Sequence, residues 1–313
     1  MTPRAAGGPD GTPPPPPAAA VPWRRIAVGV PGVEFEPRPP RQPAFDFPDT
    51  ECDGWSTADL TVRFASVRGA KHRYYRRPRQ DAARAALHEP SGTVAFAVAD
   101  GVSAATSSEL GAIEACRAAL ARTLHLLSGP PGPLDFQDVA RHAARRLWQV
   151  ARWRLNGKEP DPAEVARLYA TTLVTGVVRP DPAGPVAELC RIGDSGAWIL
   201  ERPNGRYHPL FPSKTGSDAL LVHNEVTSLP DVPDPTERAT VRLAPELTLL
   251  VGTDGFGDPL GDGDGPVGAL FGDTLARPPA PLWLAHVLDF SRETFDDDRT
   301  LLAVWPHLPG RTS

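Results

Sequence analysis

The sequence predicts an α+β sandwich with its helices on the outside. Apolar, strand-like segments form one block before residue 104 and another after residue 170, and helical periodicity fills the chain between them and near the C-terminus. Three of the apolar strands also meet a carboxylate at one end. The 313 residues are 41% hydrophobic, which is enough to bury a core of this size.

Composition excludes several classes of protein. A net charge of −5 and a pI of 5.9 do not indicate a nucleic-acid partner. The three cysteines are widely spaced without a CxxC pair, so we expect neither a disulfide framework nor a cysteine zinc site. No run of about 18 apolar residues could span a bilayer, and the N-terminus lacks the basic and apolar regions of a secretory signal. We therefore expect a cytoplasmic protein without a nucleic-acid or membrane partner.

Residues 1–48 differ in composition from the rest and hold more than a third of the 38 prolines, including the run Pro13 to Pro17. Because proline lacks a backbone N–H and fixes φ, we predict a disordered proline-rich tail there and one folded domain over residues 49–313. The tail could bind a proline-recognition partner. A solvated tail without a partner is the favoured interpretation.

The first half of the domain predicts two strands followed by two helices. Residues 60–67 alternate like a half-buried strand, and residues 94–99 form the continuous apolar run of a strand buried on both faces. A basic connection over residues 68–81 lies between them. Apolar residues at helical spacing predict helices over 107–127 and 136–155.

The second half returns to strands. An irregular flap is expected over residues 202–239, where the chain is mostly polar with scattered proline and glycine, and an amphipathic helix over residues 281–294. Strands are predicted at 170–178, 187–192, 198–201, 240–243, 247–251 and 300–305.

Carboxylates mark three strand ends. Asp100 ends the strand at 94–99, Asp254 follows the strand at 247–251, and the run Asp296 to Asp298 precedes the last strand. An ionised carboxylate at the mouth of an apolar strand needs a cation or several donors. Together these acids could form one site with only oxygen ligands. Taken singly, each Asp-Gly is more often a turn.

Five motifs, in this order, resemble the metal-dependent protein phosphatases of the 2C type. The resemblance covers residues 63–306, and a GxxH pattern at Gly69 to His72 is similar to a bacterial subgroup. The motifs are Gln80-Asp81; VADG at Val98 to Gly101; Thr171-Thr172-Leu173 with Gly193-Asp194-Ser195; TDGFGD at Thr253 to Asp258; and DDRT at Asp297 to Thr300.

The resemblance implies a four-layer αββα sandwich of two antiparallel sheets, and a phosphoprotein serine/threonine phosphatase. It implies two divalent cations, held by Asp81, Asp100, the Gly101 carbonyl, Asp254 and Asp297, with Asp100 bridging them. Oxygen ligands independently favour Mn²⁺ or Mg²⁺. Two such ions can present a shared hydroxide to phosphorus, so that no protein nucleophile is needed.

Further residues follow from the resemblance. A third, weaker cation would map to Asp194, Asp254 and Asp258, with turn capping as the alternative for Asp194 and Asp258. Arg76, five residues before Asp81, would bind the phosphate, because a guanidinium grips phosphate through two hydrogen bonds. A small register error would exchange it with Arg73, Arg77 or Arg79, and a basic loop that merely steers phosphoproteins is the plain alternative.

The chain departs from the family in two places. Val102-Ser103-Ala104 replace a loop that carries a histidine in many relatives, so the leaving group would be protonated by metal-bound water or by His72. Asp298 stands where the family usually has Asn, and of the three adjacent acids Asp297 is favoured as the ligand.

Other functions remain open at this point. A catalytically silent phosphatase fold that binds a partner is the main rival, and a phosphatase of a small phosphorylated metabolite would share the site. The GDSG sequence at Gly193 to Gly196 is similar to a serine-protease motif, but no histidine motif accompanies it. The GDGDG sequence at Gly261 to Gly265 lacks the later glutamate of a calcium loop.

Overall fold

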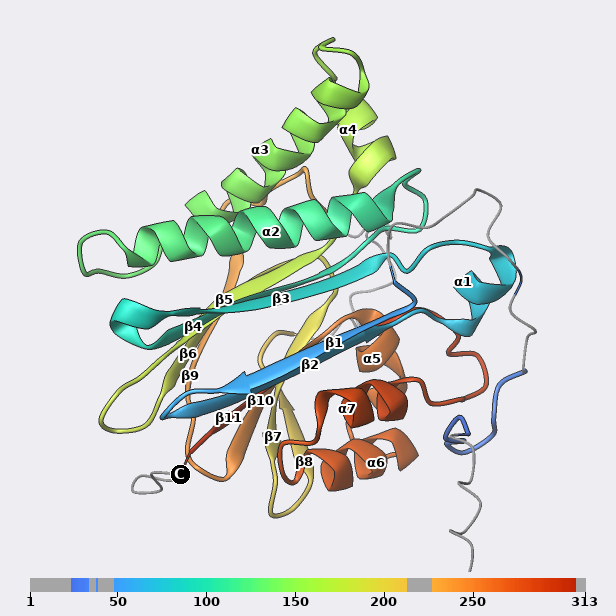
Figure 1. Ribbon diagram of the computed structural model, residues 1–313, viewed down its shortest axis with the longest axis vertical. Coiled ribbons are helices and arrows are strands. Elements are labelled where there is room, and N and C mark those ends of the chain that lie inside the picture. Colours follow the sequence, from blue (N-terminus) through green and yellow to red (C-terminus); the bar gives the residue numbers. More distant parts are fainter. Residues whose placement is uncertain (1–23, 34–37, 39–47, 213–226, 308–313) are drawn as a thin grey trace, which may run out of the picture.

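A computed structural model describes residues 24–33, 38, 48–212 and 227–307. Two antiparallel β-sheets pack face to face, with helices covering both outer faces (Figure 1). The predicted four-layer αββα sandwich is therefore confirmed. The predicted disorder of the extreme N-terminus lies outside the described residues, as do residues 213–226 of the predicted flap.

The first sheet has six strands and the second has five. The six-stranded sheet has the order β1 (Thr50–Ser56), β2 (Leu60–Val67), β11 (Arg299–Pro306), β10 (Leu247–Gly252), β7 (Gly196–Glu201) and β8 (Arg206–Pro209). The five-stranded sheet has the order β3 (Asp81–His88), β4 (Thr93–Asp100), β5 (Leu173–Arg179), β6 (Val186–Ile192) and β9 (Glu237–Arg242).

Helices cover the outer faces. α2 (Ser108–Leu127), α3 (Phe136–Arg154) and α4 (Pro162–Tyr169) lie over the five-stranded sheet, and α6 (Pro266–Leu275) and α7 (Pro281–Leu288) lie over the other (Figure 1). Two short helices, α1 (Ala70–Tyr75) and α5 (Asp254–Leu260), lie at one end of the sandwich.

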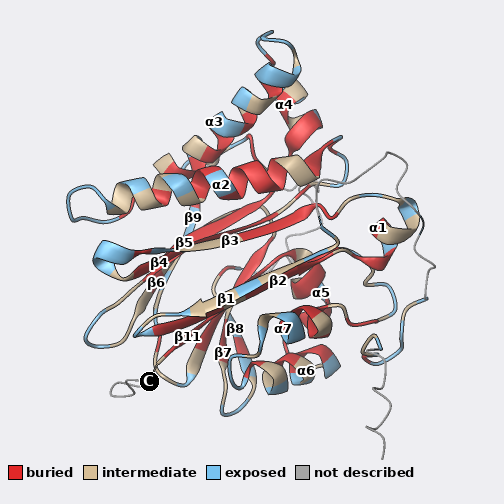
Figure 2. Cartoon of the chain, viewed as in Figure 1, coloured by how far each residue is buried: buried red, intermediate tan, exposed pale blue. Residues whose placement is uncertain are grey.

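The central strands are buried on both faces (Figure 2). Phe96 and Val98 of β4 share one buried cluster between the sheets with Leu249 and Val251 of β10. The prediction that residues 60–67 form a half-buried strand is wrong, because only Arg63 of β2 is less than buried. α7 covers the outer face of this sheet, which explains why β2 needs apolar residues on both sides.

Three other local predictions are corrected. The basic connection over residues 68–81 contains α1, and the predicted flap contains β8 and the beginning of β9. The amphipathic helix at Pro281 ends at Leu288. Within the described ranges, no helix has the length and apolar character needed to cross a membrane.

Part of the proline-rich region lies against the domain. Val28 donates its backbone N–H to Ser291 O (2.9 Å), and Ser291 N–H donates to Ile26 O (2.7 Å). Glu293 N–H donates to Val30 O (2.8 Å), and the Val28 side chain is only 6% exposed. Residues 24–33 thus form a strap across the segment that follows α7.

Candidate metal centre

Strand pairing brings the predicted acidic residues to one end of the sandwich. Asp81 begins β3 and Asp100 ends β4, and the antiparallel register places them directly opposite each other. Asp254 begins α5 immediately after β10, and Asp297 lies just before β11. Because β10 and β11 pair through Gly252 and Leu301, these two acids also meet at that end.

Asp81 joins the two sheets. Its side chain is buried, and Oδ2 accepts hydrogen bonds from Thr253 Oγ1 and Thr300 Oγ1, both 2.8 Å away. Thr300 Oγ1 also lies 2.6 Å from Ser66 Oγ. Both hydrogen bonds to the carboxylate end on Oδ2, so that Oδ1 can face a cation.

Backbone contacts fix Asp100 and Gly101. Asp100 N–H donates to Thr172 Oγ1 (2.9 Å), and Asp100 O accepts from Thr172 N–H (2.8 Å). A Cβ at Gly101 would lie 2.7 Å from Ser108 O and 2.8 Å from Gln80 O, so only glycine fits. These backbone contacts use neither the Asp100 carboxylate nor the Gly101 carbonyl oxygen, so both groups can serve as ligands.

Asp254 is the centre of the acidic group. It lines a cavity with Asp100 and Asp297, and it lines a second cavity with Asp258. Asp194 lines the first of these cavities. Burial raises the pKa of Asp254, and the charges of Asp194 and Asp258 raise it further. The structure therefore brings together all the acids predicted for the two main cations and the third one.

Burial and the neighbouring negative charges raise the pKa values of the acids at this end of the sandwich. Burial raises the pKa of Asp81 well above its ordinary value, and the neighbouring Asp298 raises it further. Burial, followed by the charges of Asp81 and Asp254, likewise raises the pKa of Asp100. Adjacent buried carboxylates of this kind are stable as anions when a cation offsets their charge. The donor set fits hard divalent cations such as Mn²⁺ or Mg²⁺.

The three adjacent acids before β11 differ in their surroundings. Asp298 is buried, and its carboxylate accepts the backbone N–H groups of Gly69 (2.7 Å) and Gln80 (2.6 Å). The Asp297 side chain is 53% exposed and lines two cavities, whereas Asp296 lines one. This geometry favours Asp297 as the ligand, although its role stays a prediction.

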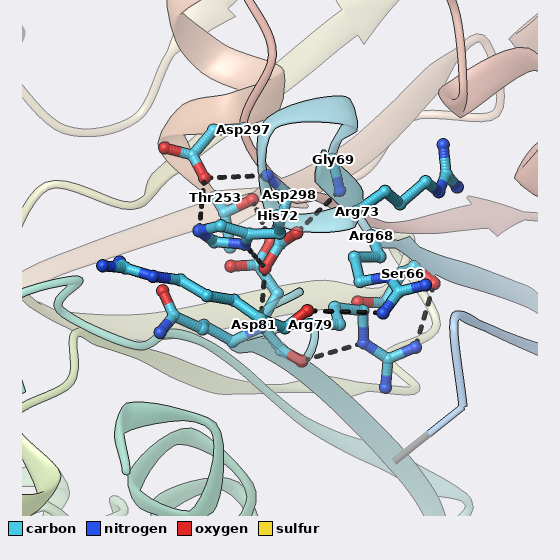
Figure 3. Close-up of polar contacts among 12 residues, drawn as sticks. Ser66, Arg68, Gly69, His72, Arg73, Arg79, Asp81, Thr253, Asp297 and Asp298 are labelled. Carbon is cyan, nitrogen blue, oxygen red and sulfur yellow. Dashed lines mark hydrogen bonds and ion pairs between the residues drawn. The ribbon is translucent and has the colours of Figure 1, made fainter. Parts of the chain in front are cut away.

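His72 lies between two of these acids (Figure 3). Its Nδ1 is 2.8 Å from Asp298 Oδ2, and its Nε2 is 3.6 Å from Asp297 Oδ1. Burial lowers the pKa of His72, but the hydrogen bond and charge of Asp298 and the charges of Asp297 and Asp81 raise it more, so its pKa lies above the ordinary value.

The basic residues around α1 have distinct roles. Arg68 and Arg73 pair with Asp49 at 2.7 and 3.0 Å, and the buried Arg79 pairs with Glu51 at 2.8 Å. Arg76 caps the C-terminus of α1 at a left-handed φ of 61°. Among the described residues, no carboxylate pairs with Arg76, and it does not line the cavity of Asp100 and Asp297. Its role as the phosphate ligand stays a prediction.

Sequence reasoning missed a groove beside the acids. Arg191 stacks 4.8 Å from the Phe211 ring, and its Nε donates to Glu237 Oε2 (2.6 Å). These residues come from segments far apart in sequence, so no local signal could have indicated the groove. A cavity of about 310 Å³ there is lined by Arg191, Asp194, Trp198, Phe211, Asp254 and Asp258, among others.

Comparison with known families decides the class of the protein. A sequence model of the family described as Protein phosphatase 2C matches residues 68–289, which is most of the domain. This chain belongs to the protein phosphatase 2C family. A search of the curated proteins finds no match.

Solved structures show the same fold. The catalytic domain of the serine/threonine protein phosphatase PstP, in complex with two manganese ions, is 17% identical, with a TM-score of 0.54, and the match covers 80% of this chain and 99% of that one. The serine/threonine phosphatase Stp1 from Staphylococcus aureus is 13% identical, with a TM-score of 0.55, over 80% and 95%. RsbX in complex with magnesium is 11% identical, with a TM-score of 0.51, over 82% and 100%.

Proposed function

We propose that this protein phosphatase 2C hydrolyses phosphoserine and phosphothreonine in proteins, with Mn²⁺ or Mg²⁺ at its acidic centre. The observation that carries the proposal is the convergence of Asp81, Asp100, Asp254 and Asp297 with the Gly101 carbonyl at one end of the sandwich. The manganese ions of PstP and the magnesium of RsbX support the choice of cations.

The bound cations would lower the pKa of water and offset the charge on the phosphate. The residues of the chain supply the rest. Thr253 and Thr300 hold the Asp81 carboxylate in one orientation, and the backbone contacts of Asp100 hold the opposite strand end. Arg76, at the end of α1, would neutralise the incoming phosphate. Without a positively charged side chain nearby, the acidic residues would repel the negatively charged phosphate.

The alternatives are weaker. Loss of the acidic ligands would favour a silent phosphatase fold, and this chain retains them. A phosphatase of a small metabolite would share the site, so substrate tests must separate the two. The free cysteines Cys52, Cys116 and Cys190 support a cytoplasmic location. Binding of the proline-rich region to a recognition module remains a proposal from sequence alone.

The first experiment measures hydrolysis of p-nitrophenyl phosphate and a phosphothreonine peptide with Mn²⁺, comparing the wild type with Asp100→Asn and Asp254→Asn. We expect activity that requires Mn²⁺ and falls at least ~100-fold in both variants, since each removes a carboxylate shared by the centre. A wild type that is inactive on both substrates with Mn²⁺ and Mg²⁺ would favour the silent binding module. Turnover of only the small ester would favour a metabolite phosphatase.

A further inference from the structure

One buried carboxylate joins three segments of the candidate metal centre. Asp298 Oδ1 accepts the N–H of Gly69 (2.7 Å), and Oδ2 lies 2.8 Å from His72 Nδ1 (Figure 3). Oδ2 also accepts the N–H of Gln80 (2.6 Å). The side chain is 2% exposed. Asp298 therefore ties the loop before β11 to the beginning of α1 and to the beginning of β3.

Each tied segment carries or supports a predicted ligand. Gln80 precedes Asp81, and Gln80 O accepts the N–H of Gly101 (3.2 Å). Asp298 itself follows Asp297, whose Oδ1 accepts the Asp298 N–H (3.0 Å). Asp298 thus binds the residue before Asp81, and that residue in turn binds the backbone of Gly101. Asp297 is the chain neighbour of Asp298. Replacement of Asp298 would loosen all three predicted ligands.

The backbone of the acidic loop packs closely against two glycines. A Cβ at Gly69 would overlap the backbone of Asp296 and Asp297, and a Cβ at Gly255 would overlap Asp298 O. The loop is therefore held between the beginnings of α1 and α5. This packing fixes the backbone that carries Asp297 and Asp298.

His72 extends this support to the exposed ligand. Its side chain is 4% exposed, and its Nε2 lies 3.6 Å from Asp297 Oδ1, whose side chain is 53% exposed. Because Asp298 sets the orientation of the imidazole, the ring presents Nε2 to Asp297 from a fixed place. An exposed carboxylate would otherwise sample several rotamers and lose entropy on ligation.

We propose that Asp298 and His72 are positioning residues that orient Asp81, the Gly101 carbonyl and Asp297 for the cations, without binding a cation themselves. The proposal rests on the proposed metal-dependent function. Residues that support metal ligands in this way typically change metal affinity or activity by about 10- to 100-fold when they are replaced. Both oxygens of Asp298 already accept N–H groups, which argues against direct ligation.

The test measures Mn²⁺ binding by the electron paramagnetic resonance signal of free Mn²⁺, together with kcat. Asp298→Asn replaces one carboxylate oxygen with an NH₂ group, which then faces a backbone N–H donor instead of accepting from it. His72→Asn keeps a hydrogen-bond donor near the position of Nδ1, but it removes the Nε2 atom that lies beside Asp297. We expect the Mn²⁺ dissociation constant to rise about tenfold or more in both variants, with unchanged stoichiometry. Excess Mn²⁺ should restore most of kcat in His72→Asn.

His88→Asn is the matched control, because His88 is also buried and lies near two hydroxyls, Ser91 Oγ (2.7 Å) and Ser128 Oγ (3.1 Å), at the far end of β3. Its Mn²⁺ affinity should stay within about twofold of the wild type. Unchanged affinity in His72→Asn and Asp298→Asn would overturn the proposal. So would loss of one bound ion, which would make Asp298 or His72 a ligand. The binding measurement decides the positioning role even if the wild type hydrolyses nothing.

Discussion

Asp49 is the residue that anchors α1 through charge. It accepts from Arg68 Nε (2.7 Å) and Arg73 Nη2 (3.0 Å), and Arg73 also reaches Asp289 (3.0 Å). Burial alone would raise the pKa of Asp49, but the hydrogen bond and charge of Arg73, with those of Arg68, lower it below 3.8. The folded state therefore binds the proton less tightly than the unfolded state. Asp49 stabilises the fold above its unfolded pKa and loses this contribution as the pH falls through its folded pKa.

Asp49→Asn should lower the free energy of unfolding at about pH 7 by about 0.5 to 1 kcal/mol, since solvent screens these partly exposed pairs. The difference from the wild type should shrink as the pH is lowered below 3.8, where the carboxyl becomes protonated in both states. Urea denaturation across this pH range measures it. A difference that does not depend on pH would mean that the substitution acts through something other than the carboxylate charge.

The site residues that could be predicted from sequence carry a local signal, whereas those found only in the structure depend on contacts between distant parts of the chain. Asp100 and Asp254 were recognisable because each follows an apolar strand and precedes glycine, which is a local signal. The hydrogen bonds that orient Asp81 come from Thr253 and Thr300, more than 170 residues away. The contacts of Asp298 were equally hidden, because its sequence position only marked it as a departure from the family.

At the scale of elements, burial decided which predictions held. β4 and β10 were predictable because sheets covered on both faces need continuous apolar runs. α5 could not be predicted as a helix, because its sequence, DGFGDPL, contains two glycines and a proline, which disfavour helices. α1 is only six residues long and has no apolar stripe to recognise.

The docking of the strap of residues 24–33 could not be predicted either, because its proline-rich surroundings indicate a tail. It is held by backbone hydrogen bonds and by Val28, which shares a buried cluster with Leu284 and Phe290. The strap pairs with the chain that leads from α7 to the acidic loop. We expect it to contribute to the stability of that loop.

Val28→Asp and Val30→Asp form a matched pair, since Val28 is 6% exposed and Val30 is 63% exposed in the same strap. Val28→Asp should destabilise the protein by about 2 kcal/mol, because a carboxylate enters an apolar cluster without a partner. Val30→Asp should stay within about 0.5 kcal/mol of the wild type. Thermal denaturation measures both. Equal effects in the two variants would show that the strap does not dock as described.

At the scale of the whole molecule, the candidate centre links the two sheets. Asp81 belongs to the five-stranded sheet, while the threonines that bind its carboxylate belong to the six-stranded sheet and to the turn after β10. The buried acids repel one another across the same junction. Cations bound there would remove this repulsion and hold the sheets together at one end.

Binding of Mn²⁺ should therefore stabilise the entire domain rather than one loop. A ligand that binds only the folded state at 100 times its dissociation constant adds about 2.7 kcal/mol, so Tm in Mn²⁺ should exceed Tm in EDTA by several degrees. Asp100→Asn should abolish most of this shift, since its carboxylate faces both Asp81 and Asp254. Asp234→Asn, a 69% exposed acid paired with Arg141 on α3, should retain the shift. An equal shift in Asp100→Asn would mean that Mn²⁺ binds elsewhere, and that the acids at the sheet junction do not form the metal centre.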